Sequence, residues 1–175
     1  MKLLAFAASS SKKSINKRLV TYACSLMEDA EVEILDLNDY ELPLFSVDRE
    51  EELGQPKLAH DFLAKIASCD GLIISFAEHN GSYSVAYKNL FDWCSRIRKE
   101  IFSDKPVVVL STSPGARGGA SVLALATASL PRFSALLKGS LPVPSFYDNF
   151  DMQQGVLKDS ELNEKLIEVV ASLKG

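Results

Sequence analysis

Residues 72–84 read Leu-Ile-Ile-Ser-Phe-Ala-Glu-His-Asn-Gly-Ser-Tyr-Ser, an apolar run that passes directly into a polar loop. The run Leu72–Phe76 is continuous rather than alternating, which is typical of a strand buried on both faces in a parallel sheet. The loop after it carries an imidazole at His79, an amide at Asn80 and a flexible glycine at Gly81. Such a loop can lay polar groups along the edge of a flat ligand, although a plain polar turn with Ser84 as a helix cap explains it too.

The same continuous pattern recurs along the chain. Four segments have it: Leu3–Ala8, Val32–Leu35, Leu72–Ser75 and Val107–Thr112. A weaker fifth candidate lies at Gly139–Val143, where Pro142 and Pro144 indicate an edge strand or an early stop. The sequence therefore predicts five short strands.

Helical spacing fills the intervals between these strands. Apolar residues recur three and four positions apart in four stripes: Leu19, Ala23, Leu26 and Met27; Leu58, Phe62 and Ile66; Leu90, Phe91, Cys94, Ile97 and Ile101; Leu162, Leu166, Val169, Val170 and Leu173. The tract Ala120–Leu137 is rich in Ala and Leu and predicts a helix that Pro131 kinks or divides. The charged run Asp48–Glu52 indicates a solvated loop or a helix start.

Strand–helix alternation repeated five times predicts an α/β fold with a parallel sheet and helices on both faces. Five strands favour the flavodoxin-like three-layer sandwich, with strand order 2-1-3-4-5, over the six-stranded dinucleotide-binding fold. The length of 175 residues suits one domain, which we expect to span residues 1–175.

Composition and charge exclude several classes of protein. The formal net charge of −4 gives no broad basic field for nucleic acid or for an anionic membrane. The three scattered cysteines, Cys24, Cys69 and Cys94, form neither a disulfide framework nor a metal motif. The apolar run Leu3–Ala8 is shorter than a typical signal-peptide core, and no apolar span of membrane length follows. We therefore expect a cytoplasmic protein that contacts neither nucleic acid nor membrane.

Two further loops stand where ligands bind in such sheets, at the carboxyl ends of the strands. Residues 8–16 read Ala-Ser-Ser-Ser-Lys-Lys-Ser-Ile-Asn and open a helix, so hydroxyls, lysines and free N–H groups favour a phosphate. The alternative is that Ser14 caps the helix and the other serines solvate a turn. Residues 112–119 read Thr-Ser-Pro-Gly-Ala-Arg-Gly-Gly, which indicates either close backbone approach to a ligand or a simple glycine turn.

Other kinds of site find little support in the sequence. The chain has neither a GxxxxGK[ST] nor a GxGxxG motif, so neither a triphosphate-binding loop nor a dinucleotide fingerprint is present. The two histidines, His60 and His79, lack metal-ligand spacing, and no GxSxG nucleophile motif occurs. We expect no metal site and no catalytic nucleophile.

The loops after the predicted strands, together with neighbouring segments, resemble those of the NADPH-dependent FMN reductase family of quinone, chromate and azo-dye reductases. The family's G-S-x-R-x-x-S-x-N loop corresponds to residues 8–16, its P-E-Y-N-G-S loop to residues 77–82, and its L-K-N-x-x-D-W-x-S-R helix to residues 87–96. Its L-P-L-[YF] segment matches residues 42–45, and its K-P and S-P-G-x-x-G-G segments match residues 105–106 and 113–119. Ser11 stands in place of the family's phosphate-binding arginine, Ala8 in place of its first glycine, and His79 in place of its loop tyrosine.

The resemblance implies a cofactor site for FMN. We expect thirteen residues to form it: Ser9, Ser11, Ser14, Ile15, Asn16, Glu78, His79, Asn80, Gly81, Ser82, Ser113, Gly115 and Gly118. In this scheme the first loop holds the phosphate, the second borders the isoalloxazine, and the third forms the other wall. Arg117 is the nearest candidate for the nicotinamide phosphate.

The resemblance further implies an FMN-dependent NAD(P)H oxidoreductase, with NADPH or NADH as hydride donor to FMN N5 and a quinone, a free flavin or another small-molecule electron acceptor in the same pocket. It implies a homodimer or homotetramer, with the helix that carries Trp93 either at the interface or in the core. The alternative is a flavodoxin-like electron carrier that NAD(P)H does not reduce directly. A flavin-free signalling domain fits least, because strand three ends in Ile74-Ser75-Phe76 rather than in a phosphoacceptor aspartate.

Overall fold

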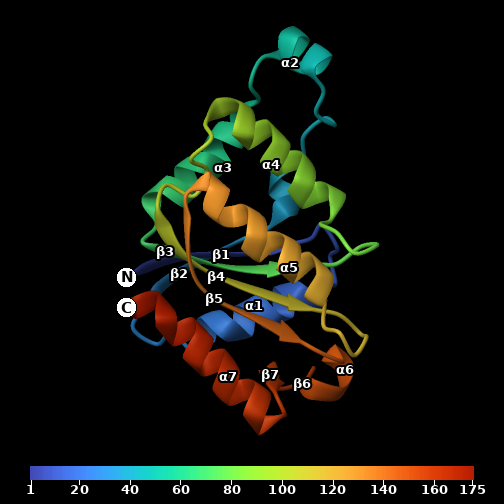
Figure 1. Ribbon diagram of the computed structural model, residues 1–175, viewed down its shortest axis with the longest axis vertical. Coiled ribbons are helices and arrows are strands. Elements are labelled where there is room, and N and C mark those ends of the chain that lie inside the picture. The colour runs from blue at the N-terminus through green and yellow to red at the C-terminus, as the bar shows by residue number, and fades with distance from the viewer.

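The computed structural model describes all 175 residues, which build a parallel sheet of five strands (Figure 1). The strands are β1 (Lys2–Ala8), β2 (Glu31–Leu35), β3 (Gly71–Phe76), β4 (Lys105–Thr112) and β5 (Ala135–Val143). They lie in the order β2-β1-β3-β4-β5, and every neighbouring pair is parallel. The predicted flavodoxin-like order is therefore confirmed.

The helices lie between and after the strands. They are α1 (Ile15–Ser25), α2 (Val47–Leu53), α3 (Lys57–Ser68), α4 (Val85–Ile97), α5 (Ala120–Ser129), α6 (Phe146–Asn149) and α7 (Ser160–Ala171). Three short 3₁₀ helices lie after β2, α5 and α7: η1 (Leu37–Tyr40), η2 (Leu130–Phe133) and η3 (Ser172–Lys174). A small antiparallel hairpin, β6 (Phe150–Asp151) with β7 (Val156–Leu157), precedes α7.

The sheet separates two hydrophobic cores, which makes three layers (Figure 1). Helices α3, α4 and α5 cover one face, and α1 with α7 cover the other. Alternate residues of a strand point to opposite faces, so Leu4 and Phe6 enter the first core while Leu3 and Ala5 enter the second. Trp93 of α4 is fully buried in the first core, so within the single chain it is a core residue.

The tract Ala120–Leu137 was predicted as a helix that Pro131 kinks or divides, and the structure divides it there, with its last residues in a strand. Helix α5 ends at Ser129, η2 carries Pro131, and Ser134 takes a left-handed conformation with φ of 62° before β5 begins at Ala135. Proline lacks the N–H that would continue the helix, and the sheet edge then offers hydrogen bonds to the residues beyond it. The predicted fifth strand is confirmed as an edge strand and starts four residues earlier than expected.

Helix α2 contains the charged run Asp48–Glu52, which is thus a short helix rather than a loop. None of its residues is buried, and in Figure 1 it stands apart from the sheet. The segment before it is anchored by α4, because the Trp93 indole donates to the Pro43 carbonyl at 2.7 Å and the Phe45 N–H donates to the Asn89 side chain at 2.8 Å.

Candidate functional site

Strands β1, β3 and β4 are neighbours in the sheet, so the loops at their carboxyl ends meet. Between these loops lies a cavity of about 230 Å³. It is lined by Ser9, Ser11, Lys13, Ser14, Ile15, Asn16, Ala77, Glu78, His79, Thr112, Ser113, Pro114 and Tyr147. Eight of the thirteen residues expected from the sequence are therefore brought together here: Ser9, Ser11, Ser14, Ile15, Asn16, Glu78, His79 and Ser113.

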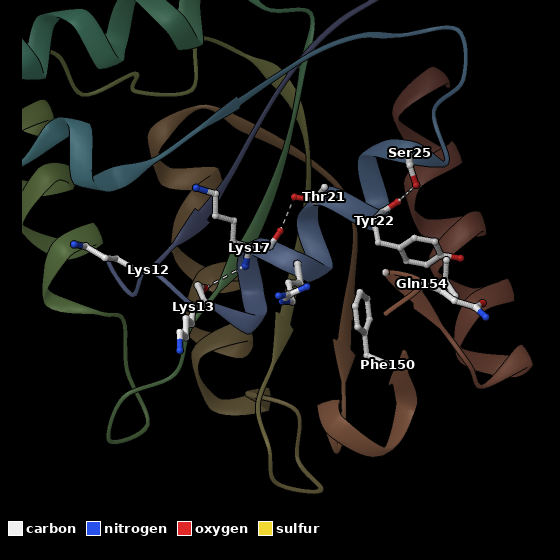
Figure 2. Close-up of a pocket in the computed structure, with 12 residues that line it drawn as sticks. Lys12, Lys13, Lys17, Thr21, Tyr22, Ser25, Phe150 and Gln154 are labelled. Atoms are coloured by element: carbon white, nitrogen blue, oxygen red, sulfur yellow. Dashed lines mark hydrogen bonds between the residues drawn. The ribbon is translucent and has the colours of Figure 1, made fainter. Parts of the chain in front are cut away.

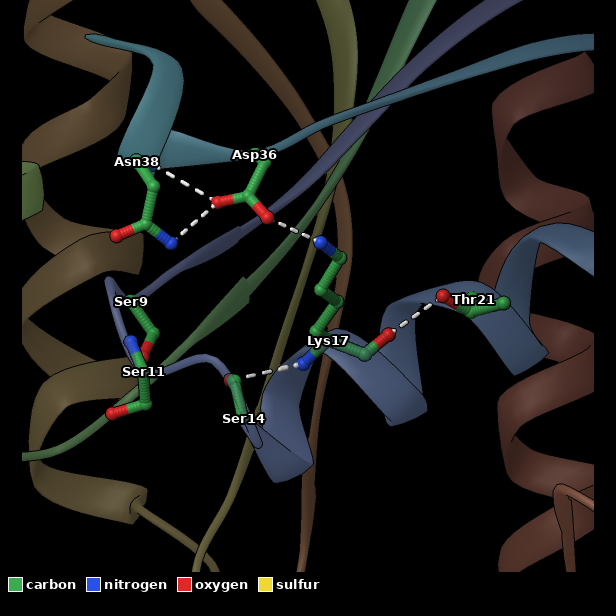
Figure 3. A network of polar contacts seen from close by, with 7 residues as sticks. All are labelled: Ser9, Ser11, Ser14, Lys17, Thr21, Asp36 and Asn38. Atoms are coloured by element: carbon green, nitrogen blue, oxygen red, sulfur yellow. Dashed lines mark hydrogen bonds and ion pairs between the residues drawn. The ribbon is translucent and has the colours of Figure 1, made fainter.

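The β1–α1 loop combines a helix cap with open donors (Figure 3). The Ser14 hydroxyl accepts the Lys17 N–H at 3.1 Å, and the Ser9 hydroxyl accepts the Ser11 N–H at 3.1 Å. The N–H groups of Ile15 and Asn16 donate to no other atom of the chain. A helix N-terminus with unused donors attracts anions, so the capping role and the anion-binding role coexist in this loop.

The Asn16 side chain ties the β1–α1 loop to the sheet. Its Nδ2 donates to the Thr112 carbonyl at 3.2 Å, while its Oδ1 accepts the Thr112 N–H at 3.0 Å and the Ser75 hydroxyl at 2.8 Å. The side chain is 2% exposed. Asn16 therefore offers a ligand its backbone N–H, and its amide holds strands β3 and β4 in place under the loop.

Lys17 in the first turn of α1 faces Asp36 at the end of β2 (Figure 3). Their Nζ–Oδ2 distance is 2.5 Å, and Asp36 also accepts the Asn38 N–H at 3.0 Å. The hydrogen bond from Lys17, with that from the Asn38 backbone, lowers the pKa of the Asp36 carboxyl to about 2. Lys17 is thereby held by a carboxylate and directed away from the cavity.

The β3–α4 loop is a tight hairpin turn. The His79 N–H donates to the Ser82 carbonyl at 3.0 Å, and the Ser82 N–H donates back at 3.1 Å. Asn80 and Gly81 between them have φ of 53° and 75°, the signs that a type I′ turn requires and that Asn-Gly readily supplies. These four residues are exposed at the rim, and only His79 of them lines the cavity.

Glu78 joins the second loop to the third. Its carboxylate accepts the Val122 N–H in the first turn of α5 at 2.8 Å, so it caps that helix. Ser84 joins the second loop to the first. Its hydroxyl donates to the Ala8 carbonyl at 2.8 Å and accepts the Tyr87 N–H as the cap of α4. The three loops are thus fixed to one another by direct hydrogen bonds.

The β4–α5 loop packs against the end of β5. A Cβ on Gly118 would lie 2.6 Å from the Val143 carbonyl carbon, and the Ser111 hydroxyl donates to the Gly118 carbonyl at 2.7 Å. Gly118 is buried, whereas Gly115 is exposed and a Cβ there would make only an ordinary contact with the Ser113 hydroxyl, at 3.8 Å. Arg117 is exposed and donates to the Ser121 hydroxyl at 3.0 Å.

Five residues on the cavity wall were outside the predicted cofactor set: Lys13, Ala77, Thr112, Pro114 and Tyr147. Four of them belong to the loops that the sequence singled out. Tyr147 is different, because it lies on α6 and is 58% exposed. The backbone brings it near, since the Phe146 N–H donates to the Ser113 carbonyl at 3.0 Å. No sequence motif marks this contact.

The size and lining of the cavity suit the phosphate end of FMN. Its volume of about 230 Å³ is below the roughly 300–1,000 Å³ of pockets that enclose a whole small ligand. It offers hydroxyls, unused N–H groups and the Lys13 ammonium, and it leaves the exposed rim of His79 to Ser82 for a flat ring. No group of histidine, cysteine and acidic side chains is placed to hold a metal ion.

Several known proteins of similar sequence are named as reductases. The family model described as NADPH-dependent FMN reductase matches residues 1–146. An NADPH:quinone oxidoreductase of Arabidopsis thaliana is 28% identical over 99% of this chain and 90% of its own length. A 2-hydroxy-1,4-benzoquinone reductase of a Burkholderia species is 34% identical over 69% of this chain and 64% of its own length.

The fold is shared with a solved flavoenzyme. FerB, an NAD(P)H:(acceptor) oxidoreductase from Paracoccus denitrificans, superposes with a TM-score of 0.78 at 24% identity, over 99% of this chain and 95% of that one. The chain also has no helix long and apolar enough to cross a bilayer. Because the family model covers most of the sequence, the chain belongs to the NADPH-dependent FMN reductase family, which confirms the expectation of an oxidoreductase that uses FMN and NAD(P)H.

Proposed function

We propose that this chain is an FMN-dependent NAD(P)H oxidoreductase that moves hydride from a nicotinamide to FMN N5 and then electrons to a quinone, a free flavin or a similar acceptor in the same pocket. The observation that carries the proposal is the cavity at the ends of β1, β3 and β4, with open N–H donors and hydroxyls at the start of α1. The flavin supplies the redox chemistry, and the protein supplies position and electrostatics.

The phosphate end is held by the β1–α1 loop in this proposal. Ile15 and Asn16 donate their N–H groups, and the helix dipole adds favourable potential. The Ser9 and Ser14 hydroxyls each accept one N–H from the chain, which leaves their own protons free to donate to a phosphate oxygen. The Lys13 ammonium adds positive charge in a loop where Ser11 replaces the family's arginine.

The ring end lies between the other two loops. His79, Asn80, Gly81 and Ser82 form one rim, and Ser113 with Gly115 forms the opposite wall. Glu78 keeps the two walls at a fixed separation through its hydrogen bond to α5. The chain needs no nucleophile, and its thiols suit none, because burial raises the pKa of Cys24 and Cys94 to about 12.

A second copy of the chain is the proposed cover for the open ring end. Large apolar side chains stand exposed on the α2 segment and at the start of α4: Leu44, Val47, Leu53 and Val85. Leu44 and Val85 line the same surface pocket, and exposed apolar side chains at one place are typical of an interface between subunits. The expected homodimer or homotetramer stays a prediction, as do the single domain over residues 1–175 and the cytoplasmic location.

Flavin reduction tests the proposed function. We expect the purified chain to hold FMN with an oxidised-flavin absorption band, and anaerobic mixing with NADPH to bleach that band within the enzyme's turnover time. Adding a quinone should restore it. A chain that binds no FMN after incubation with excess cofactor contradicts the proposal. A chain that binds FMN but is not reduced by NADPH or NADH is instead the electron carrier.

His79→Ala tests the ring end of the site. The backbone N–H and carbonyl of His79, not its imidazole, close the turn with Ser82, so the turn survives the substitution. Loss of one aromatic contact costs about 0.5–1.5 kcal/mol, so we expect the KM for a quinone to rise about twofold to tenfold. FMN affinity, measured by quenching of flavin fluorescence, should stay within about twofold. Unchanged kinetics with several acceptors would remove His79 from the site.

A further inference from the structure

A second cavity begins at the phosphate end of the FMN site and runs along the outer side of α1 (Figure 2). It is a groove of about 600 Å³ between α1 and the β6–β7 hairpin. That volume falls within the range of about 300–1,000 Å³ that small-molecule sites occupy. FMN, as proposed above, ends at the start of α1, so it leaves this groove free.

The groove and the FMN cavity share two lining residues, Lys13 and Ser14. Both belong to the loop that holds the FMN phosphate in the proposed function, so the groove opens at that phosphate and not at the ring end. A ligand that continues from the FMN site into the groove is therefore one that extends the flavin through its phosphate. FAD is such a ligand, because a second phosphate joins its FMN half to adenosine.

The groove is cationic in a protein whose net charge is −4. Lys12, Lys13, Lys17 and Arg18 line it, and no carboxylate does. Asp36 neutralises Lys17, whereas the other three cations take part in no ion pair. A phosphomonoester such as that of FMN concentrates a charge of about −1.5 to −2 at one point. FAD divides its charge between two phosphates, so the second phosphate meets the unpaired cations of the groove.

Ser14, Arg18 and Tyr22 are four residues apart and therefore share one face of α1. At the rise of an α-helix, Ser14 and Tyr22 are about 12 Å apart along the axis, which leaves room for a phosphate and a ribose before an aromatic base. Tyr22 is half-buried and packs edge to face on Phe150, with ring centroids 6.2 Å apart (Figure 2). Its hydroxyl donates to the Asn163 side chain at 2.6 Å, which fixes the ring. A fixed aromatic ring at this distance from the phosphate end suits an adenine.

We propose that the α1 groove binds the adenosine monophosphate half of FAD, so that the flavin site takes FAD as well as FMN and holds FAD more tightly. This inference rests on the proposed function, because it needs the flavin phosphate at the start of α1. Arg18 binds the second phosphate through charge-assisted hydrogen bonds, Lys13 lies at the bridge between the two phosphates, and Tyr22 contacts the adenine. Gln154 also lines the groove, and only its backbone N–H donates within the chain. Its side-chain amide can both donate to and accept from the edge of the base.

The first experiment lets the two flavins compete for the protein. FMN-loaded protein is incubated with an equal excess of FMN and FAD and freed of unbound flavin, and the bound flavins are released by heat and separated by chromatography. We expect the unsubstituted protein to carry about tenfold more FAD than FMN, because the second phosphate and the adenine add contacts. The double variant Arg18→Gln with Tyr22→Ala should carry the two flavins in about equal amounts. Its affinity for FMN, measured by flavin fluorescence, should stay within about twofold.

Arg132→Gln is the matched control for this competition. Arg132 is exposed on η2, which packs on the opposite face of the sheet from α1, and it takes part in no ion pair. This variant should keep the preference for FAD. An unsubstituted protein that carries no more FAD than FMN, or a double variant that keeps the preference, overturns the proposal. Arg18→Gln alone gives the same comparison if the double variant does not fold.

The second experiment uses ADP, which carries the two phosphates and the adenosine of FAD without the flavin. Added to the FMN-loaded protein, ADP should compete with the FMN phosphate for the start of α1 and release FMN, seen as a rise in flavin fluorescence. Inorganic pyrophosphate lacks the adenosine and should need a concentration about tenfold higher for the same release. Release at the same concentration by both compounds, or by neither, overturns the groove assignment. Failure of the proposed function is a separate result, because neither FMN nor FAD then binds.

Discussion

Gly118→Ala is expected to lower the free energy of unfolding by about 3–5 kcal/mol, a large part of the total stability of a domain of this size. The added Cβ would lie 2.6 Å from the Val143 carbonyl carbon, 2.7 Å from its oxygen and 2.8 Å from the Pro144 nitrogen. These are backbone atoms at the end of β5, so they cannot swing aside as the tip of a side chain does. Gly118 also has φ of 58°, which an alanine adopts only with strain.

Gly115→Ala is the matched control within the same loop. Its Cβ would meet only the Ser113 hydroxyl, at 3.8 Å, and its φ is not in the left-handed region. We expect its free energy of unfolding to stay within about 0.5 kcal/mol of the unsubstituted protein. Urea titrations followed by far-UV circular dichroism compare the two variants, and the soluble fraction reports on Gly118→Ala if it fails to fold. Equal stability of the two variants would contradict this account of the loop.

Asn16→Ala is expected to cost about 3 kcal/mol of stability in the FMN-free protein. The substitution removes three buried hydrogen bonds and leaves groups of Thr112 and Ser75 without their partner. FMN affinity should fall as well, by about tenfold or more, because the start of α1 is no longer tied to β4. Urea unfolding without cofactor and flavin fluorescence titration provide the two measurements.

Ser75→Ala is the graded control for the Asn16 prediction. It removes one of the three hydrogen bonds, so we expect a loss of about 1 kcal/mol in the same unfolding experiment. The sequence places Asn16 among the expected phosphate ligands without separating its amide from its backbone. If the amide itself bound the phosphate, Asn16→Ala would weaken FMN binding and leave the FMN-free protein as stable as before. That outcome would contradict the structural role.

The sheet was predictable because its central strands are buried on both faces. Leu72–Ile74 and Val107–Leu110 are unbroken apolar runs, and a glycine-containing loop follows each strand. The start of β5 was not predictable in the same way, since residues 135–137 continue a tract of Ala, Leu and Ser that favours a helix. Hydrogen bonds with β4 outweigh this local preference. Because β4 lies about thirty residues earlier in the chain, the local sequence around residue 135 gives no sign of this pairing.

The candidate site was predictable where neighbouring residues in the sequence carry the chemistry. The five residues expected from the β1–α1 loop (Ser9, Ser11, Ser14, Ile15 and Asn16) and His79 were found from their own loops, and all six line the cavity. The roles of individual atoms were not predictable, because they depend on distant partners. Glu78 caps α5 through Val122, and Gly118 lies against the Val143 backbone. Tyr147 reaches the wall only through the packing of α6 on the β4–α5 loop.

The position of Tyr147 also has a consequence for how the protein is made. A ribosome releases the chain from Met1 onward, and β1 with the phosphate loop emerges first. The Asn16 amide in that loop has its partners only after Thr112 has been synthesised. The cavity wall is complete only after Tyr147 has been synthesised. The nascent chain therefore has no finished flavin site until residue 147 has emerged. Cofactor loading therefore follows the synthesis and folding of the whole stretch from residue 9 to residue 147.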